Sequence, residues 1–150
     1  MGVGGYRRIL VGVDGTDRSF AAAVRAIEMA MSTGADLYVL SVVPVPVPGV
    51  PIAPAGRTTI DRSLTDRRAR AAEAVAAAAE RAGDHGLRVT TAVVDGDPAT
   101  CIVRTAVDVG ADVIVVGNRG LDPAGRYVLG SVPEAVLHAT ACDVLIVRTA

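Results

Sequence analysis

The chain has 150 residues, 51% of them apolar, and a formal net charge of −1; it contains no lysine, and all 15 basic residues are arginine. This length suits one domain spanning residues 1–150. The near-neutral charge gives no overall electrostatic basis for binding nucleic acid or an anionic membrane. No apolar run reaches the ~18 residues of a membrane span, and the start, MGVGGYRR, has no apolar signal region. We therefore expect a cytoplasmic protein with no nucleic-acid or membrane partner.

The N-terminal part of the sequence alternates a strand, a helix and a strand. Residues 8–13 form a short continuous apolar run, which is typical of a strand buried on both faces. Asp17 is a suitable N-cap for the helix that follows, and Gly34 is a suitable end for it. Residues 37–43 predict a second strand. Five prolines between residues 44 and 54 then exclude a helix or a central strand and predict extended surface chain.

The middle of the chain continues the alternation. A helix rich in alanine and arginine is expected from about residue 63 to residue 82, and its arginine cluster is expected to be a solvated face: Arg62, Arg67, Arg68 and Arg70. Residues 88–94 predict a third strand. Asp97 is a suitable N-cap for the next helix, which has proline at its first position and Val107 on its apolar side.

The C-terminal part adds a strand, a helix and a strand. Residues 112–116 predict the fourth strand, and residues 143–147 the fifth. Between them, Ser131 and Glu134 have the spacing of a capping box for a helix that ends near Ala139. Apolar strands separated by helices predict an α/β fold, a parallel sheet with helices on both faces. Ligands of such sheets bind at the carboxyl ends of the strands, where the strand order reverses.

A glycine-rich loop follows the fourth strand with the spacing Gly117-x2-Gly120-x9-Gly130-Ser131. Glycine allows close approach of the backbone to a ligand, and the start of a helix presents free N–H groups to an anion. Arg119, inside the loop, is a candidate phosphate ligand or a solvent-facing arginine. The loop predicts a phosphate site that needs no lysine.

Asp14 leaves the first strand at the same end of the sheet if the first and fourth strands are neighbours. Its carboxylate can accept hydrogen bonds from a ribose or an adenine amino group, or it can cap its own turn. Val42, at the end of the second strand, is placed to present backbone to a base. The chain has no GxxxxGK[ST] motif, and its two histidines lack metal-ligand or triad spacing.

The whole chain resembles the universal stress protein family. The motifs that carry the resemblance are ILVGVDGTDRS near the start, ADVIVVGNRG, the glycine spacing, and GSVPEAVLHATACDVLIVRT at the end. The resemblance implies a three-layer fold whose five-stranded parallel sheet has the order 3-2-1-4-5. It also implies an adenine nucleotide in the crevice and a homodimer joined through the last strand, Asp143 to Val147. The site residues carried over from the resemblance are Val13, Asp14, Val42, Val116, Gly117, Arg119, Gly120, Gly130, Ser131 and Val132.

Pro133 departs from many ATP-binding members, which have serine or threonine after GSV. Proline has neither a hydroxyl nor an N–H to offer a phosphate. The GNxG…GSVP pattern is similar to that of an actinobacterial branch with cyclic AMP-binding members. ATP, with Mg²⁺ where a metal is required, remains the default ligand, and AMP or cyclic AMP is the alternative.

Three functions follow from these features. The first is a cytoplasmic binding module that senses or sequesters adenine nucleotides, without catalysis. The second is an enzyme with slow ATP hydrolysis or autophosphorylation on Ser131, for which Asp14 and Asp122 are the nearest carboxylates. The third is a structural partner protein without a ligand. Independently of the resemblance, an apolar last strand would leave an exposed edge if it lies outermost, and a second copy would cover it.

Overall fold

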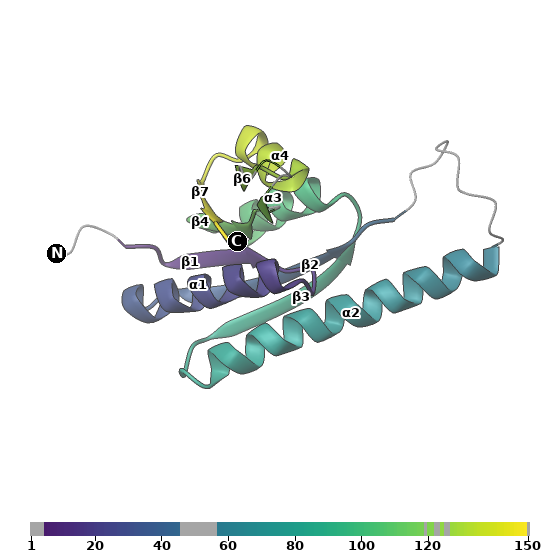
Figure 1. Ribbon diagram of the computed structural model, residues 1–150. Helices are drawn as coiled ribbons and strands as arrows, with labels where there is room; N and C mark the ends of the chain where they lie inside the picture. The colour runs from purple at the N-terminus through teal and green to yellow at the C-terminus, as the bar shows by residue number, and fades with distance from the viewer. Residues whose placement is uncertain (1–4, 46–56, 119, 122–123, 125–126, 150) are drawn as a thin grey trace.

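The computed structural model describes residues 5–45, 57–118, 120–121, 124 and 127–149. Five parallel strands form one sheet in the order β3-β2-β1-β4-β7, which confirms the predicted fold (Figure 1). Its strands are β1 (Arg8–Gly12), β2 (Asp36–Val43), β3 (Val89–Asp95), β4 (Val113–Gly117) and β7 (Asp143–Val147). The helices are α1 (Asp17–Thr33), α2 (Arg57–Gly83), α3 (Pro98–Val109) and α4 (Ser131–Ala139). A short antiparallel pair that the sequence did not predict, β5 (Gly120–Leu121) and β6 (Tyr127–Val128), lies in the glycine loop.

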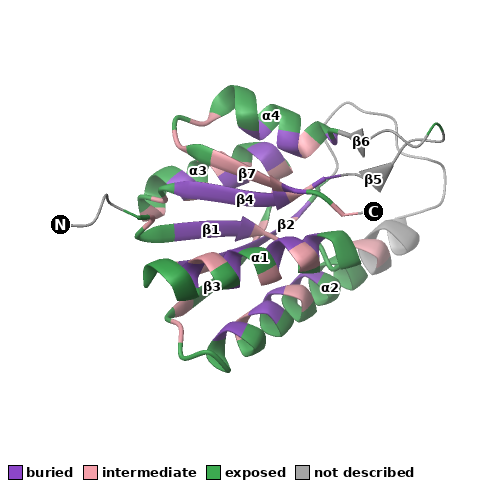
Figure 2. Cartoon of the chain, turned by 60° about the vertical axis from the view of Figure 1, so that its left-hand side comes forward, coloured by how far each residue is buried: buried purple, intermediate pink, exposed green. Residues whose placement is uncertain are grey.

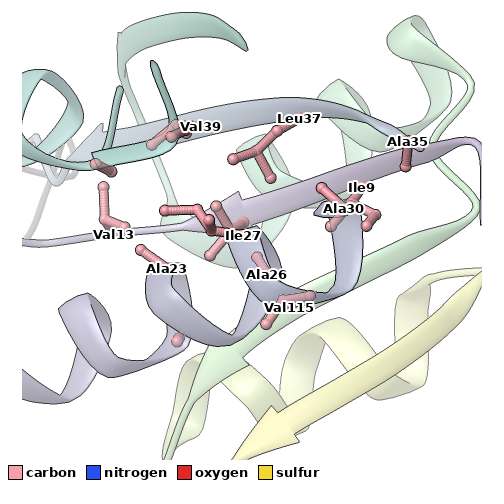
Figure 3. Packing of buried hydrophobic residues seen from close by; sticks show 14 of the residues in the cluster. Ile9, Val13, Ala23, Ala26, Ile27, Ala30, Ala35, Leu37, Val39 and Val115 are labelled. Atoms are coloured by element: carbon pink, nitrogen blue, oxygen red, sulfur yellow. The ribbon is translucent and has the colours of Figure 1, made fainter. Parts of the chain in front are cut away.

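Helices cover the sheet on both faces (Figure 2). Helices α1 and α2 pack on one face, where Ile9 and Val11 share a core cluster with buried alanines of both helices. Figure 3 shows Ile9 beside alanines of α1. Helices α3 and α4 pack on the other face, against Leu10 and Ile114. Successive residues of a strand point to opposite faces, so a continuous apolar run serves both cores. Small alanine side chains allow α1 to lie close to the sheet.

Helix ends agree with the predicted signals at two places and differ at two. Asp97 caps α3 by accepting from the Thr100 N–H at 3.0 Å, as predicted. The N-cap of α1, however, is Thr16 rather than Asp17, because Thr16 Oγ1 accepts from the N–H of Ser19 at 3.2 Å. Asp17 is instead the first helical residue, where its charge favours the positive end of the helix dipole. Gly34 ends α1 in the left-handed conformation, as predicted.

The predicted capping box of α4 is wrong. The N-cap is Gly130, and no side chain makes the capping hydrogen bond. Ser131 lies one position inside the helix, so its hydroxyl is not placed to make the capping bond. This leaves the first backbone N–H groups of α4 open to another acceptor.

Two further differences concern the start of one helix and the buried face of another. Helix α2 starts at Arg57, about a turn and a half before the predicted start. Val107 of α3 is 76% exposed instead of buried. The prediction for the proline-rich segment lies largely outside the described residues. Within the described part of the chain, no helix has the length and apolar character needed to cross a membrane.

Candidate functional site

A cavity of about 540 Å³ lies at the carboxyl ends of β1 and β4. The two strands are neighbours, with β2 on the far side of β1, so the strand order reverses here. Eight of the ten predicted site residues are among the described residues that line the cavity: Val13, Asp14, Val42, Val116, Gly117, Gly130, Ser131 and Val132. Gly120 lies in β5. Arg119 lies outside the described residues.

Asp14 both caps its own turn and lines the cavity. Its Oδ1 accepts hydrogen bonds from the Thr16 N–H at 2.9 Å and the Thr16 hydroxyl at 2.6 Å, while its N–H donates to Ser19 Oγ at 3.0 Å. Partial desolvation raises the pKa of this carboxyl. The hydrogen bonds from Thr16, with smaller contributions from Ser19 and the charge of Arg18, outweigh this effect, and the net pKa is below the usual value. Asp14 is therefore a carboxylate at neutral pH. A carboxylate has about four acceptor sites, so Asp14 can still accept a hydrogen bond from a ligand hydroxyl beside those from Thr16.

The N-terminus of α4 forms the opposite wall. Gly130, Ser131 and Val132 line the cavity, and the N–H groups at the first positions of a helix have no acceptor within the helix. Pro133 is buried at the next position and contributes no N–H. The positive end of the helix dipole favours an anion at this wall.

Arginine side chains add positive charge to the cavity, a role that was not predicted from the sequence. Arg67 and Arg70 of α2 line the cavity together with Arg18 of α1. The prediction of a solvated arginine face was therefore incomplete. Arg67 and Arg70 are exposed, but their spacing places them on one side of α2, which faces the cavity. Arg68 instead pairs with Asp95 at 2.5 Å.

The charge of the cavity lining is accordingly positive. Among the described lining residues, Asp14 is the only acidic side chain, against three arginines. The remaining wall is mostly apolar and includes Leu40, Ile102 and Val116. A lining of this kind suits a ligand with a flat apolar part and an anionic part. Within the described residues, no group of three His, Cys, Asp or Glu side chains is placed to hold a metal, and Asp122 lies outside them.

The structure shows roles for two residues at the end of β4 that were not predicted from the sequence. A Cβ added to Gly117 would lie 3.0 Å from the backbone oxygen of Arg18, so this glycine allows the start of α1 to pack on β4. Asn118, which lines the cavity and is only 7% exposed, was not predicted as a site residue. Asn118 is one of the two variable positions (x2) between Gly117 and Gly120 in the glycine motif. Only the tertiary structure identifies it as a residue of the site.

Comparison with known protein families shows to which family the chain belongs. The model of the universal stress protein family matches residues 5–148. The chain belongs to the universal stress protein family. The resemblance inferred from the sequence motifs is thereby confirmed at the level of the family.

Individual family members match over most of their length. A universal stress protein of Methanocaldococcus jannaschii is 35% identical, over 95% of this chain and 82% of its own. The structure of UspA from Lactobacillus plantarum superposes with a TM-score of 0.79 at 27% identity, covering 95% of this chain and 98% of its own. A crystal structure of a universal stress protein in complex with cAMP has a TM-score of 0.63 at 34% identity, covering 97% of this chain and 99% of its own.

Proposed function

We propose that this universal stress protein binds an adenine nucleotide in the cavity between β1 and β4 and acts as a sensing or regulatory module. The observation that carries the proposal is the convergence of Asp14 and the N-terminus of α4 on one cavity, although Ser131 follows Asp14 by 117 positions in the chain. A cavity of about 540 Å³ is large enough for a mononucleotide.

The cavity offers a suitable set of residues to each part of the nucleotide, namely the phosphate, the ribose and the base. A phosphate accepts hydrogen bonds from the backbone N–H groups of Ser131 and Val132 and from the Ser131 hydroxyl. The Asp14 carboxylate accepts from a ribose hydroxyl, since its low pKa keeps it ionised. The adenine ring lies against the apolar wall that includes Leu40 and Val42.

A single phosphate group suits the α4 wall best, so AMP or cyclic AMP is our first candidate. Pro133 removes one of the backbone donors that a helix start normally offers. The family member that was crystallised with cAMP is 34% identical to this chain over nearly its full length. Both points support a nucleotide with one phosphate.

ATP is the second candidate, because Arg67 and Arg70 line the same cavity. A guanidinium group can donate two parallel hydrogen bonds to the oxygens of one phosphate. The two arginine charges would compensate the negative charge of the additional phosphates of ATP. A bound triphosphate would bring Mg²⁺ with it. We propose that the protein is cytoplasmic and acts without catalysis.

We further propose a homodimer formed along β7. This strand lies at the edge of the sheet, next to β4 alone, and its central residues Val144, Leu145 and Ile146 are only partly buried. An apolar edge strand presents unpaired backbone groups, which a second copy satisfies. Sedimentation equilibrium of the native protein and of a Leu145→Arg variant tests this: the native protein should be dimeric and the variant monomeric.

Calorimetric titration with cyclic AMP, AMP, ADP and ATP, with cyclic GMP as the base control, tests the ligand. We expect saturable binding of adenine nucleotides and much weaker binding of cyclic GMP. Asp14→Ala should reduce the affinity for each of them. Absence of binding by all four adenine nucleotides would refute the proposal. Metal-dependent phosphate release above that of Ser131→Ala, or phosphate incorporated at Ser131, would instead support the enzyme hypothesis.

A further inference from the structure

Asn118 connects the cavity to the end of the edge strand. It directly follows β4, lines the cavity and is only 7% exposed. Its backbone N–H donates to the carbonyl of Val147, the last residue of β7, at 3.1 Å. The same residue therefore contacts both the candidate ligand site and the C-terminal segment.

The orientation of the Asn118 side-chain amide follows from its contacts with Thr149. Its Oδ1 accepts from the Thr149 backbone N–H at 3.0 Å and from the Thr149 hydroxyl at 3.2 Å. A backbone N–H can only donate, so the atom that faces it must be the amide oxygen. Exchanging Oδ1 and Nδ2 would place two donors against each other.

The amide nitrogen of Asn118 consequently faces away from Thr149, and it is buried without an acceptor among the described residues. Buried side-chain donors in folded proteins nearly always have a partner, because an unmet donor is destabilising. Asn118 is the only described residue with such an atom. Since Asn118 lines the cavity, a ligand bound there can supply the missing acceptor.

We propose that Asn118 Nδ2 donates a hydrogen bond to an oxygen of the nucleotide's ribose–phosphate part, an inference that rests on the proposed function. Phosphate and ribose oxygens are acceptors, and the other anion-binding groups of the cavity lie on the N-terminus of α4 and on the arginines. Because one amide group serves both partners, nucleotide binding and the docking of Thr149 on Asn118 stabilise each other. Thr149 itself is not among the cavity-lining residues.

The composition of the chain makes a direct test possible. Asn118 is its only asparagine, and the chain has no glutamine, so the side-chain NH₂ of Asn118 gives the only carboxamide signal in a ¹⁵N-correlated NMR spectrum. Saturation of the native protein with AMP should shift this signal and slow its exchange with water. The exchange of the Thr149 backbone N–H should slow as well. Unchanged Asn118 NH₂ signals at saturation would overturn the proposal.

Asn118→Asp provides the complementary binding test. Aspartate keeps an oxygen for the two Thr149 donors but replaces the NH₂ group by a second, negatively charged oxygen. We expect the affinity for AMP to fall at least tenfold in protein that circular dichroism shows to be folded. The melting temperature should fall as well, because the new carboxylate oxygen is buried without a donor. Ala77→Asp, which adds the same charge at an exposed position of α2, should leave the affinity unchanged.

The results separate this inference from the proposed function. If the native protein binds no adenine nucleotide, the proposed function fails and this inference fails with it. If the native protein binds AMP and Asn118→Asp binds it equally well, the nucleotide site stands and only the role of Asn118 is refuted.

Discussion

Replacing Gly117 with alanine tests how the end of β4 is joined to the start of α1. Gly117 is the last residue of β4 and lines the cavity. An added Cβ would lie 3.0 Å from the backbone oxygen of Arg18 and 3.3 Å from its carbonyl carbon. Both atoms belong to the backbone of α1, so no side-chain rotation relieves the contact. Helix and strand must instead separate by a few tenths of an ångström.

The expected magnitude follows from two opposing effects. Overpacking of a well-packed region costs about 1–3 kcal/mol. Alanine restricts the unfolded chain more than glycine does, which returns about 0.4–1 kcal/mol. We therefore expect the free energy of unfolding to fall by about 1–2 kcal/mol, or roughly 2–8 °C in Tm for a domain of this size. Nucleotide affinity should fall too, because Ser19, next to the crowded atoms, supports the Asp14 turn.

Urea denaturation followed by circular dichroism measures the change, and Gly83→Ala is the matched control. Gly83 is the last residue of α2, has no atom within 4 Å of an added Cβ, and has no left-handed backbone. The control should be neutral or slightly stabilising. If Gly117→Ala and Gly83→Ala have the same free energy of unfolding within about 0.5 kcal/mol, the steric argument is refuted.

Three further predictions concern charge and phosphate recognition. The double change Arg67→Gln and Arg70→Gln should weaken ATP binding by at least tenfold and AMP binding less, as measured by calorimetry. The control Arg81→Gln, in the last turn of α2, should change neither affinity. Equal losses for both nucleotides would contradict the charge argument. Pro133→Thr should strengthen ATP binding selectively, because it restores an N–H and a hydroxyl; an equal gain for AMP would refute this reason. Hydrogen bonds from two backbone N–H groups, at 2.7 and 2.9 Å, lower the pKa of Asp112 below its usual value of 3.8. The ionised form of Asp112 therefore stabilises the fold at pH values above 3.8. This stabilisation is lost as the pH falls through the lowered pKa of the folded state. Asp112→Asn should therefore lower the urea midpoint at pH 7 and have a smaller effect below pH 4; a constant effect across that range would count against the assignment.

Local signals in the sequence predicted most of the secondary structure. Gly34 ends α1 in the left-handed conformation and Asp97 caps α3, because these are short-range preferences of the chain itself. The same signals were misleading where two adjacent residues compete for one role. Thr16 rather than Asp17 caps α1, and Gly130 precedes Ser131 at the start of α4. A shift of one position in the helix start changes which side chain can accept from the free N–H groups, and the periodicity of the sequence does not locate a helix start to one residue.

The candidate site was predictable where its residues belong to a motif or to a strand end. Asp14 and Ser131 were found in this way, and the structure brings both to one cavity. Arg67 and Arg70 were missed because a basic stretch on a helix is usually solvated. Asn118 was missed because an unmet donor becomes visible only once the burial and the partners of the residue are known.

The sequence by itself determined the alternation of strands and helices and the position of the glycine-rich loop, since both depend on local composition and spacing. Its family motifs implied the order of the strands, which the structure confirms. Only the tertiary structure decided which side chains meet. Packing of α2 against β2 and β3 carries two arginines to a cavity formed by β1 and β4, and the pairing of β4 with β7 brings Thr149 to Asn118. These contacts join residues far apart in the chain, so they depend on the packing of whole elements and leave no local pattern.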